Sequence, residues 1–438
     1  MLNKLTASGS YLMAIFLPFY FIRFNIFEKG SVNLLDLALI VFLAGFGLCL
    51  FDKKFRNEFG KYCWAMRGFI APAALIILGC FLSYAMALGE YEWTRGIGVM
   101  KSFYVLPFLF ALAGGFFWSR NEKLFLRFLG IYFFTSSVIA VWGVAAILGG
   151  NLTYDGRLTL GQWSPNQLAI YLAPGLLLAW FFLKKTRKNK GWLFFLLIAL
   201  TAAHFACIYT TKSLGSWLGL LGAGGFLFAA GQFKPGGRFD CREKIFLWVL
   251  GFWFIALAGI FLTGPGIKKM DYSPFVSHNS LDSRLVIYMS SLKIIRDNWL
   301  WGIGPGNFLQ AYLDYQKFFP PYPQWAVPHA HNLLLNFWLE AGLAGVAGFF
   351  WLFFRLIRAC SFLGGQKAGK IRKADRSVTL AGSIIIYFLA HGIFDTTFWR
   401  NDFSLMFFSM LAVYFAYCAT AFPKDNKEIN LLKEAKNF

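Results

Sequence analysis

The sequence predicts an all-α polytopic membrane protein of about twelve transmembrane helices with one large exterior loop. Of its 438 residues, 58% are hydrophobic and only 14% are charged, whereas average soluble domains have about 45–50% apolar and roughly 25% charged residues. Apolar segments recur along the chain, and basic residues gather in alternate loops. This composition excludes a soluble enzyme, a disordered chain and a secreted disulfide scaffold. We therefore expect residues 1–438 to form a single transmembrane domain.

Twelve segments approach the length needed to cross a bilayer, which is about 20 mostly apolar residues. The first is long enough to act as an anchor rather than a cleavable signal. Two are irregular, because one contains Lys101 and another begins at the break formed by Pro165 and Asn166. The predicted spans are 8–27, 33–51, 68–88, 96–118, 124–148, 166–183, 192–210, 213–231, 245–263, 331–354, 377–394 and 403–422.

The distribution of the 42 lysines and arginines predicts the orientation of these spans. Most of them lie in one set of alternate loops and in the two terminal segments. Positively charged short loops remain in the cytoplasm, so we expect both termini to be cytoplasmic. The net charge of +21 then reflects topology, and no nucleic acid partner is needed to explain it. The short loops of the opposite set contain only Lys29, Arg95, Arg157, Lys212 and Arg400.

One long segment, residues 264–330, separates the predicted spans 245–263 and 331–354 and falls on the exterior side. It is rich in aromatic and apolar residues, so we expect it to pack on membrane lipids. Ser280 and Asp282 are candidate helix caps. The apolar residues that follow recur at helical spacing, which predicts an amphipathic helix in the membrane interface. These residues are Leu285, Met289, Leu292 and Trp299.

Arg284 lies on this predicted helix, about 180° from Lys293 on a helical wheel. It therefore points away from the solvated charges, beside Tyr288 and Ser291. One interpretation is a surface ion pair or an anchor for lipid phosphate. The other is a cation presented to an anionic substrate, because the planar guanidinium group pairs well with phosphate oxygens.

Two of the five histidines, His329 and His331, lie at the end of the long segment, immediately before a span. On a helix, residues two positions apart point about 200° apart. The two imidazoles could therefore share a metal ion only if Pro328 kept the backbone extended. A histidine here is either a general base at neutral pH or a helix cap that forms hydrogen bonds at the interface.

These motifs resemble those of the O-antigen ligase and polymerase family of bacterial membrane glycosyltransferases. His331-Asn332, nine further residues and then Gly342-x-x-Gly345 match the ligase pattern. Further similarity lies upstream, in order along the chain. It comprises Gly156-Arg157, the Ser-Pro-Asn-Gln-Leu-Ala run at 164–169, Ser283-Arg284, Asn298-Trp299 and the glycine-rich turn 302–308.

The resemblance implies transfer of a glycan from undecaprenyl diphosphate to an acceptor hydroxyl of the lipid A-core type, in lipopolysaccharide biosynthesis. The reaction would be inverting, would use no metal or other cofactor, and would occur at the periplasmic face of the bacterial inner membrane. His331 matches the family's presumed base, and Arg284 an arginine on the diphosphate. Arg157 is a candidate second phosphate contact, and Asp395 resembles an acidic position near the end of a span.

One position departs from the family pattern. Leu214 stands where the family has an arginine at the start of a span, and Lys212 is the nearest residue that could supply the charge. His329, Asn332 and Arg400, which lie at the same predicted membrane face, complete the candidate substrate-binding set.

Three alternatives remain open from the sequence. A polymerase would use a second lipid-linked repeat unit as the acceptor, and a protein O-oligosaccharyltransferase would use a protein; both share these motifs. A secondary transporter would need polar groups near the membrane midplane. Only Lys101 and His204 are clear candidates at that depth, whereas the other titratable groups gather at the exterior face.

Overall fold

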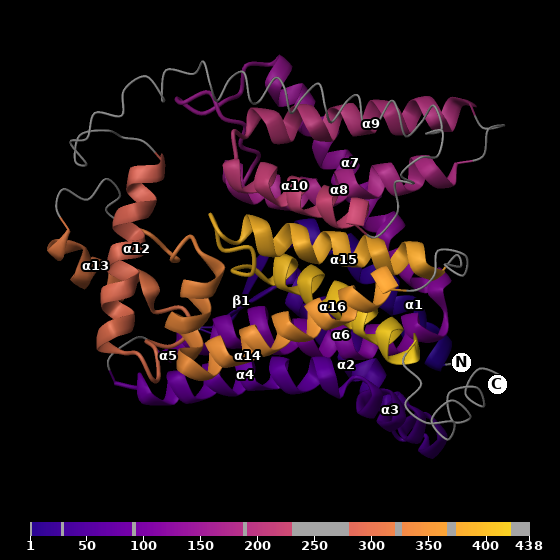
Figure 1. Ribbon diagram of the computed structural model, residues 1–438, viewed down its shortest axis with the longest axis horizontal. Helices are drawn as coiled ribbons and strands as arrows, with labels where there is room; N and C mark the ends of the chain where they lie inside the picture. The colour runs from indigo at the N-terminus through magenta and orange to yellow at the C-terminus, as the bar shows by residue number, and fades with distance from the viewer. Residues whose placement is uncertain are drawn as a thin grey trace.

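The computed structural model describes residues 2–27, 30–89, 93–186, 191–229, 280–319, 326–365 and 374–421 (Figure 1). Most of this part is helical, which confirms the predicted all-α class apart from one short hairpin. The helices are α1 (Leu2–Leu12), α2 (Leu34–Cys49), α3 (Lys53–Ala65), α4 (Arg67–Met86), α5 (Trp93–Val99), α6 (Leu106–Arg120), α7 (Glu122–Leu148), α8 (Pro165–Lys185), α9 (Gly191–Thr210), α10 (Leu214–Ala229), α12 (Ser280–Asp297), α13 (Phe308–Tyr315), α14 (Leu333–Gly365), α15 (Ala374–His391) and α16 (Asn401–Ala421).

Among the residues that the structure describes, six helices are long and apolar enough to cross a membrane. A seventh span results if α2 and α3, which are bent by 114° relative to each other, are counted as one. Residues 214–228 and 377–391 form shorter apolar helices. A multi-pass membrane protein is therefore supported, but the predicted number of twelve spans is not confirmed. The predicted span 245–263 lies outside the described residues. The six helices cover Arg67–Met86, Arg95–Arg120, Glu122–Leu148, Pro165–Lys185, Gly191–Thr210 and Leu333–Ile357.

The first predicted span, 8–27, is wrong as a continuous helix. Helix α1 ends at Leu12 and is followed by two single 3₁₀ turns, η1 (Met13–Ile15) and η2 (Leu17–Phe19). Pro18 at the start of η2 has no N–H to donate, and its ring would clash with the preceding helical turn. The chain then forms an antiparallel hairpin of β1 (Arg23–Phe27) and β2 (Gly30–Asn33).

Helix α14 packs closely against α4 through small residues. A Cβ atom on Gly79 of α4 would lie 2.6 Å from the carbonyl oxygen of Ala341, and one on Gly348 would lie 2.8 Å from that of Pro72. Small residues allow helix backbones to approach this closely. Gly342 differs, because it breaks α14 with φ 59° and ψ −157°, a conformation that glycine adopts readily.

The glycine-rich turn 302–308, which follows α12, packs against α14 at the break formed by Gly342. The N–H of Ile303 donates to the carbonyl of Leu339 at 2.7 Å, and that of Leu343 donates to the carbonyl of Leu300 at 3.0 Å. A Cβ on Gly302 would lie 2.5 Å from the Leu339 oxygen. The two glycine motifs therefore dock α12 onto α14. They are structural, and they fix the relative positions of the segments that carry Arg284 and His331.

Helix α12 lies across one end of the long helices, at the left of Figure 1. Its predicted apolar face points away from the protein, because Leu285 is 58% exposed and Leu292 is 54% exposed. The face packed against the protein instead presents Ile287, Ile294 and Ile295. An interfacial location for the exposed face remains a prediction.

Candidate functional site

The site lies where several helices and their connecting loops meet at the end of the bundle that α12 crosses. The N–H of Leu333, the first residue of α14, donates to the carbonyl of Gly392 in the loop after α15 at 2.7 Å. On the other side, Leu158 in the loop before α8 donates to Thr210 at the end of α9 at 3.1 Å. These loops carry the polar residues that the sequence singled out.

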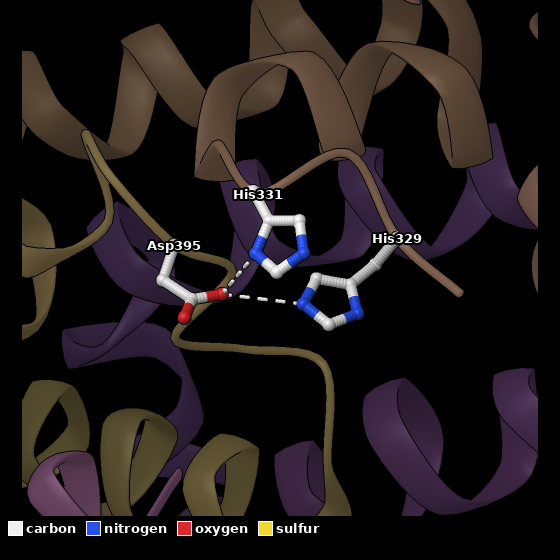
Figure 2. Close-up of side chains that lie close together, drawn as sticks. All are labelled: His329, His331 and Asp395. Atoms are coloured by element: carbon white, nitrogen blue, oxygen red, sulfur yellow. Dashed lines mark hydrogen bonds and ion pairs between the residues drawn. The ribbon is translucent and has the colours of Figure 1, made fainter. Parts of the chain in front are cut away.

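The segment before α14 is not helical, so the predicted separation of the two histidines does not apply. Pro328 to Asn332 form a bend, and α14 begins only at Leu333. The centroids of the His329 and His331 rings are consequently only 4.3 Å apart. Figure 2 shows both rings turned toward Asp395.

One carboxylate oxygen of Asp395 faces both imidazoles. Its Oδ1 lies 3.1 Å from Nδ1 of His331 and 3.2 Å from Nε2 of His329. The backbone N–H of Thr396 donates to the same oxygen at 2.7 Å. The Asp395 side chain is 7% exposed and that of His331 is 19% exposed. The carboxylate is thus buried, and His331 is the more exposed of the two side chains.

The charge state of this group follows from its neighbours. Burial would raise the pKa of the Asp395 carboxyl, but the adjacent His331 and His329 rings hold that pKa well below its usual range. Burial lowers the pKa of His329, and the charge of His331 lowers it further, while Asp395 opposes both effects. Asp395 is therefore an ionised acceptor, and His329 favours the neutral form.

His331 is held in an unusual backbone conformation, with φ 50°. Left-handed non-glycine residues cost about 1–3 kcal/mol and persist where their surroundings demand them. Here the Tyr288 hydroxyl of α12 donates to the His331 carbonyl at 2.9 Å and to that of Ile393 at 3.1 Å. Among the described residues, Lys212 is the only other non-glycine residue with positive φ, and it too is a candidate site residue.

Asn332 uses its amide group within the protein. Its Oδ1 accepts hydrogen bonds from the N–H groups of Leu334 and Leu335 at 3.0 and 3.1 Å, which caps α14. Its Nδ2 donates to the carbonyl of Ile393 at 3.0 Å. The structure therefore assigns Asn332 a supporting role next to His331. The predicted contact of this residue with substrate remains untested.

The two arginines expected to bind phosphate, Arg284 and Arg157, both act electrostatically on this group. The charge of Arg284 lowers the pKa of His329. Burial lowers the pKa of Arg157, and the charge of Arg284 adds to that effect while Asp395 opposes it. Arg284 and Arg157 thus interact electrostatically with the His–Asp group, and phosphate binding by these two residues stays a prediction.

The loop that carries Arg157 is organised by the Pro-Asn motif. Nη2 of Arg157 donates to Oδ1 of Asn166, in the first turn of α8, at 2.7 Å, and Nε donates to the Thr211 carbonyl at 2.8 Å. Nζ of Lys212 donates to the carbonyl of Asp155 at 2.7 Å. Lys212 and Arg157 therefore lie on adjoining loops. Lys212 is a cation two residues before Leu214, which stands where the family pattern has an arginine.

Arg400 is placed differently from the other candidate cations. It is 5% exposed, and its Nε donates to Oδ1 of Asp402 at 2.8 Å. Its guanidinium group lies over the Tyr20 ring at 3.6 Å and the Phe403 ring at 4.0 Å. The ion pair compensates this charge internally, so its predicted role in substrate binding remains untested.

Two residues that support the site, Trp399 and Glu340, were not identified from the sequence. The indole of Trp399 stacks on His329, with a centroid distance of 5.0 Å and an angle of 27°. Its Nε1 donates to Oε1 of Glu340 at 2.9 Å, and the Tyr104 hydroxyl donates to the other carboxylate oxygen. Glu340 is 1% exposed. A carboxylate inside an apolar span is itself a signal of function, so Glu340 could have been identified from the sequence.

A family model described as O-antigen ligase matches residues 199–350, which include α10, α12 and the two histidines but exclude Arg157 and Asp395. A search of curated proteins finds no match. The family match supports an assignment to the O-antigen ligase and polymerase family and a function of that type. It confirms the resemblance seen in the motifs.

Proposed function

We propose that this chain, as a relative of the O-antigen ligases, is a membrane glycosyltransferase. It transfers a glycan from undecaprenyl diphosphate to an acceptor hydroxyl of the lipid A-core type at the periplasmic face of the bacterial inner membrane. Both termini lie in the cytoplasm. The observation that carries the proposal is the contact of Asp395 with His331, 64 residues apart in the chain, beside two arginines.

His331 acts as the general base in this proposal. Its Nδ1–H donates to Asp395 Oδ1 at 3.1 Å, which selects the tautomer whose Nε2 carries the lone pair. Nε2 accepts the proton of the acceptor hydroxyl while the hydroxyl oxygen attacks the anomeric carbon. Asp395 orients the ring and stabilises the imidazolium that forms, so it is a positioning residue. A single displacement of this kind inverts the anomeric configuration.

Arg284 and Arg157 stabilise the leaving group. As the glycosidic bond breaks, its electron pair moves to an oxygen of the lipid diphosphate, where negative charge grows. Cationic groups already fixed in position stabilise such charge most effectively. Arg157 is fixed by Asn166 and Thr211, and the mutual repulsion of the two arginines is relieved when the anionic diphosphate lies between them.

The transporter alternative receives no support from the two deep candidates. Nζ of Lys101 forms an ion pair with Asp36 at 3.1 Å. Nε2 of His204 shares a hydrogen bond with Ser136 at 2.9 Å, and the His204 ring stacks on Phe133. Both candidates are therefore engaged by neighbouring residues within the helix bundle.

The test of the function is reconstitution of the purified full-length chain in liposomes. The liposomes contain undecaprenyl-diphosphate-linked glycan and are offered a lipid A-core glycolipid, a second lipid-linked repeat unit or an acceptor protein. We expect transfer to the glycolipid with release of undecaprenyl diphosphate. Transfer only to a second repeat unit or to protein would identify the polymerase or the O-oligosaccharyltransferase. No transfer to any acceptor would contradict the proposed function.

Arg284→Lys keeps the positive charge but removes the planar fork that pairs with two phosphate oxygens. We expect transfer to fall by about 10–100-fold, in line with the loss of one charge-assisted hydrogen bond of roughly 1.5–3 kcal/mol. The measurement is the rate in the reconstituted system. Arg296→Lys is the matched control, because Arg296 is exposed on the same helix. An unchanged rate for Arg284→Lys would argue against bidentate phosphate binding.

A further inference from the structure

His329, His331 and Asp395 present three atoms that commonly bind transition metals. Each of the three side chains has one ligand atom within 4.8 Å of a ligand atom of the other two, and Figure 2 shows the three side chains converging. The bend from Pro328 to Asn332 makes this convergence possible. From the sequence, a shared metal ion required Pro328 to keep the backbone extended. The segment is instead a bend with His331 at φ 50°, and this bend brings the two imidazoles together.

The spacing of the donor atoms fits a zinc-type ion. Bonds of about 2.0–2.2 Å at roughly tetrahedral angles place neighbouring donor atoms about 3.3 Å apart. Oδ1 of Asp395 lies 3.1 Å from His331 Nδ1 and 3.2 Å from His329 Nε2. Two imidazoles and one carboxylate also form a donor set that suits zinc and its neighbours in the periodic table. An ion could therefore replace the hydrogen bonds with only small movements of the side chains.

We propose that these three residues form a binding site for a divalent transition metal ion of the zinc type, and that the bound ion inhibits glycan transfer. The first part depends only on the geometry. The second part rests on the proposed role of His331 as the base.

Inhibition follows from the tautomer of His331. The base requires Nδ1 to carry a proton and Nε2 a lone pair. A metal ion requires the lone pair on Nδ1, so the ring proton moves to Nε2. In that form Nε2 cannot accept the proton of the acceptor hydroxyl. The ion and the reaction thus compete for the same imidazole, and neither redox chemistry nor a second reactant is involved.

The neighbouring arginines oppose the metal ion. Arg284 and Arg157 are cations that interact electrostatically with His329 and with Asp395. Their positive charge weakens the binding of a dication. We therefore expect affinity below that of a structural zinc site, and tighter binding in Arg284→Gln.

The binding test uses the purified full-length chain in detergent after metal removal with a chelator. The chain is titrated with Co²⁺, whose visible absorption reports tetrahedral coordination, and the Co²⁺ is then displaced by Zn²⁺. We expect Asp395→Asn and His329→Ala to weaken binding by at least about 100-fold, since even residues behind the ligands change metal affinity by roughly 10–100-fold. Asp155→Asn is the matched control and should bind as the unaltered chain does.

Size-exclusion profiles and Tm values identify variants that have lost the fold. Absence of a Co²⁺ spectrum in the unaltered chain, or a spectrum that survives in folded Asp395→Asn and His329→Ala, overturns the site. In the reconstituted system, Zn²⁺ should inhibit transfer, and chelator should restore it. Binding without inhibition overturns the second part and counts against His331 as the base. Absence of binding with normal transfer overturns the metal site and leaves the proposed function standing.

Discussion

Replacing His331 with asparagine is expected to lower the rate of glycan transfer by about 10²–10⁴-fold, the usual contribution of a general base. Asparagine is the informative replacement because His331 has φ 50°. Asparagine tolerates the left-handed region better than most residues, so the bend before α14 should persist. The amide nevertheless cannot accept a proton as imidazole does.

The measurement is the initial rate of transfer in liposomes, together with the Tm of the purified chain. His331→Ala provides a second variant that lacks any side-chain donor or acceptor. Asn151→Ala, in the exposed loop after α7, is a control for handling and reconstitution. A folded His331→Asn chain that transfers glycan at the normal rate would refute the assignment of the base.

Asp395→Asn is expected to lower kcat by roughly 10²-fold or more and to leave KM nearly unchanged. The carboxylate selects the His331 tautomer and stabilises its positive charge through the contact of 3.1 Å. The amide is neutral, and its NH₂ group can face the ring instead of its oxygen. Because the residue does not touch substrate in this proposal, the loss should fall on the chemical step.

Two further variants separate positioning from a merely structural role. Asp395→Glu retains the charge and should recover part of the rate. In the double variant with His331→Asn, the rate should be no lower than in His331→Asn alone, because residues that act as a unit are strongly non-additive. A double variant in which the two losses multiply would show that Asp395 and His331 act independently.

Most helices could be located from the sequence because their signals are local. The predicted spans 124–148 and 166–183 correspond to α7 and α8, whose first turns are capped by Asn121 and Ser164. Apolar runs of this length and side-chain caps depend on neighbouring residues only. The prediction failed for 8–27, where Pro18 and a hairpin interrupt an apolar run that has the right length but no continuous helix.

The face of α12 shows a second limit of local reasoning. Periodicity identified the helix but could not decide which apolar stripe faces the protein. Leu285 and Leu292 are exposed, whereas Ile287 and Ile294 are buried. In a membrane protein both faces can be apolar, because lipid on one side and protein on the other are both apolar environments.

The sequence by itself determined the membrane class and the approximate bounds of most helices, and it showed the resemblance to the O-antigen ligases that the family model supports, because composition, apolar runs and short motifs are read from neighbouring residues. It also predicted His331 and Arg284 as site residues. Only the tertiary structure decided that the rings of His329 and His331 converge on one carboxylate oxygen of Asp395. That convergence depends on a non-helical bend before α14 and on the docking of the loop after α15 against it. Contacts between residues 64 positions apart arise from packing, which no local pattern specifies.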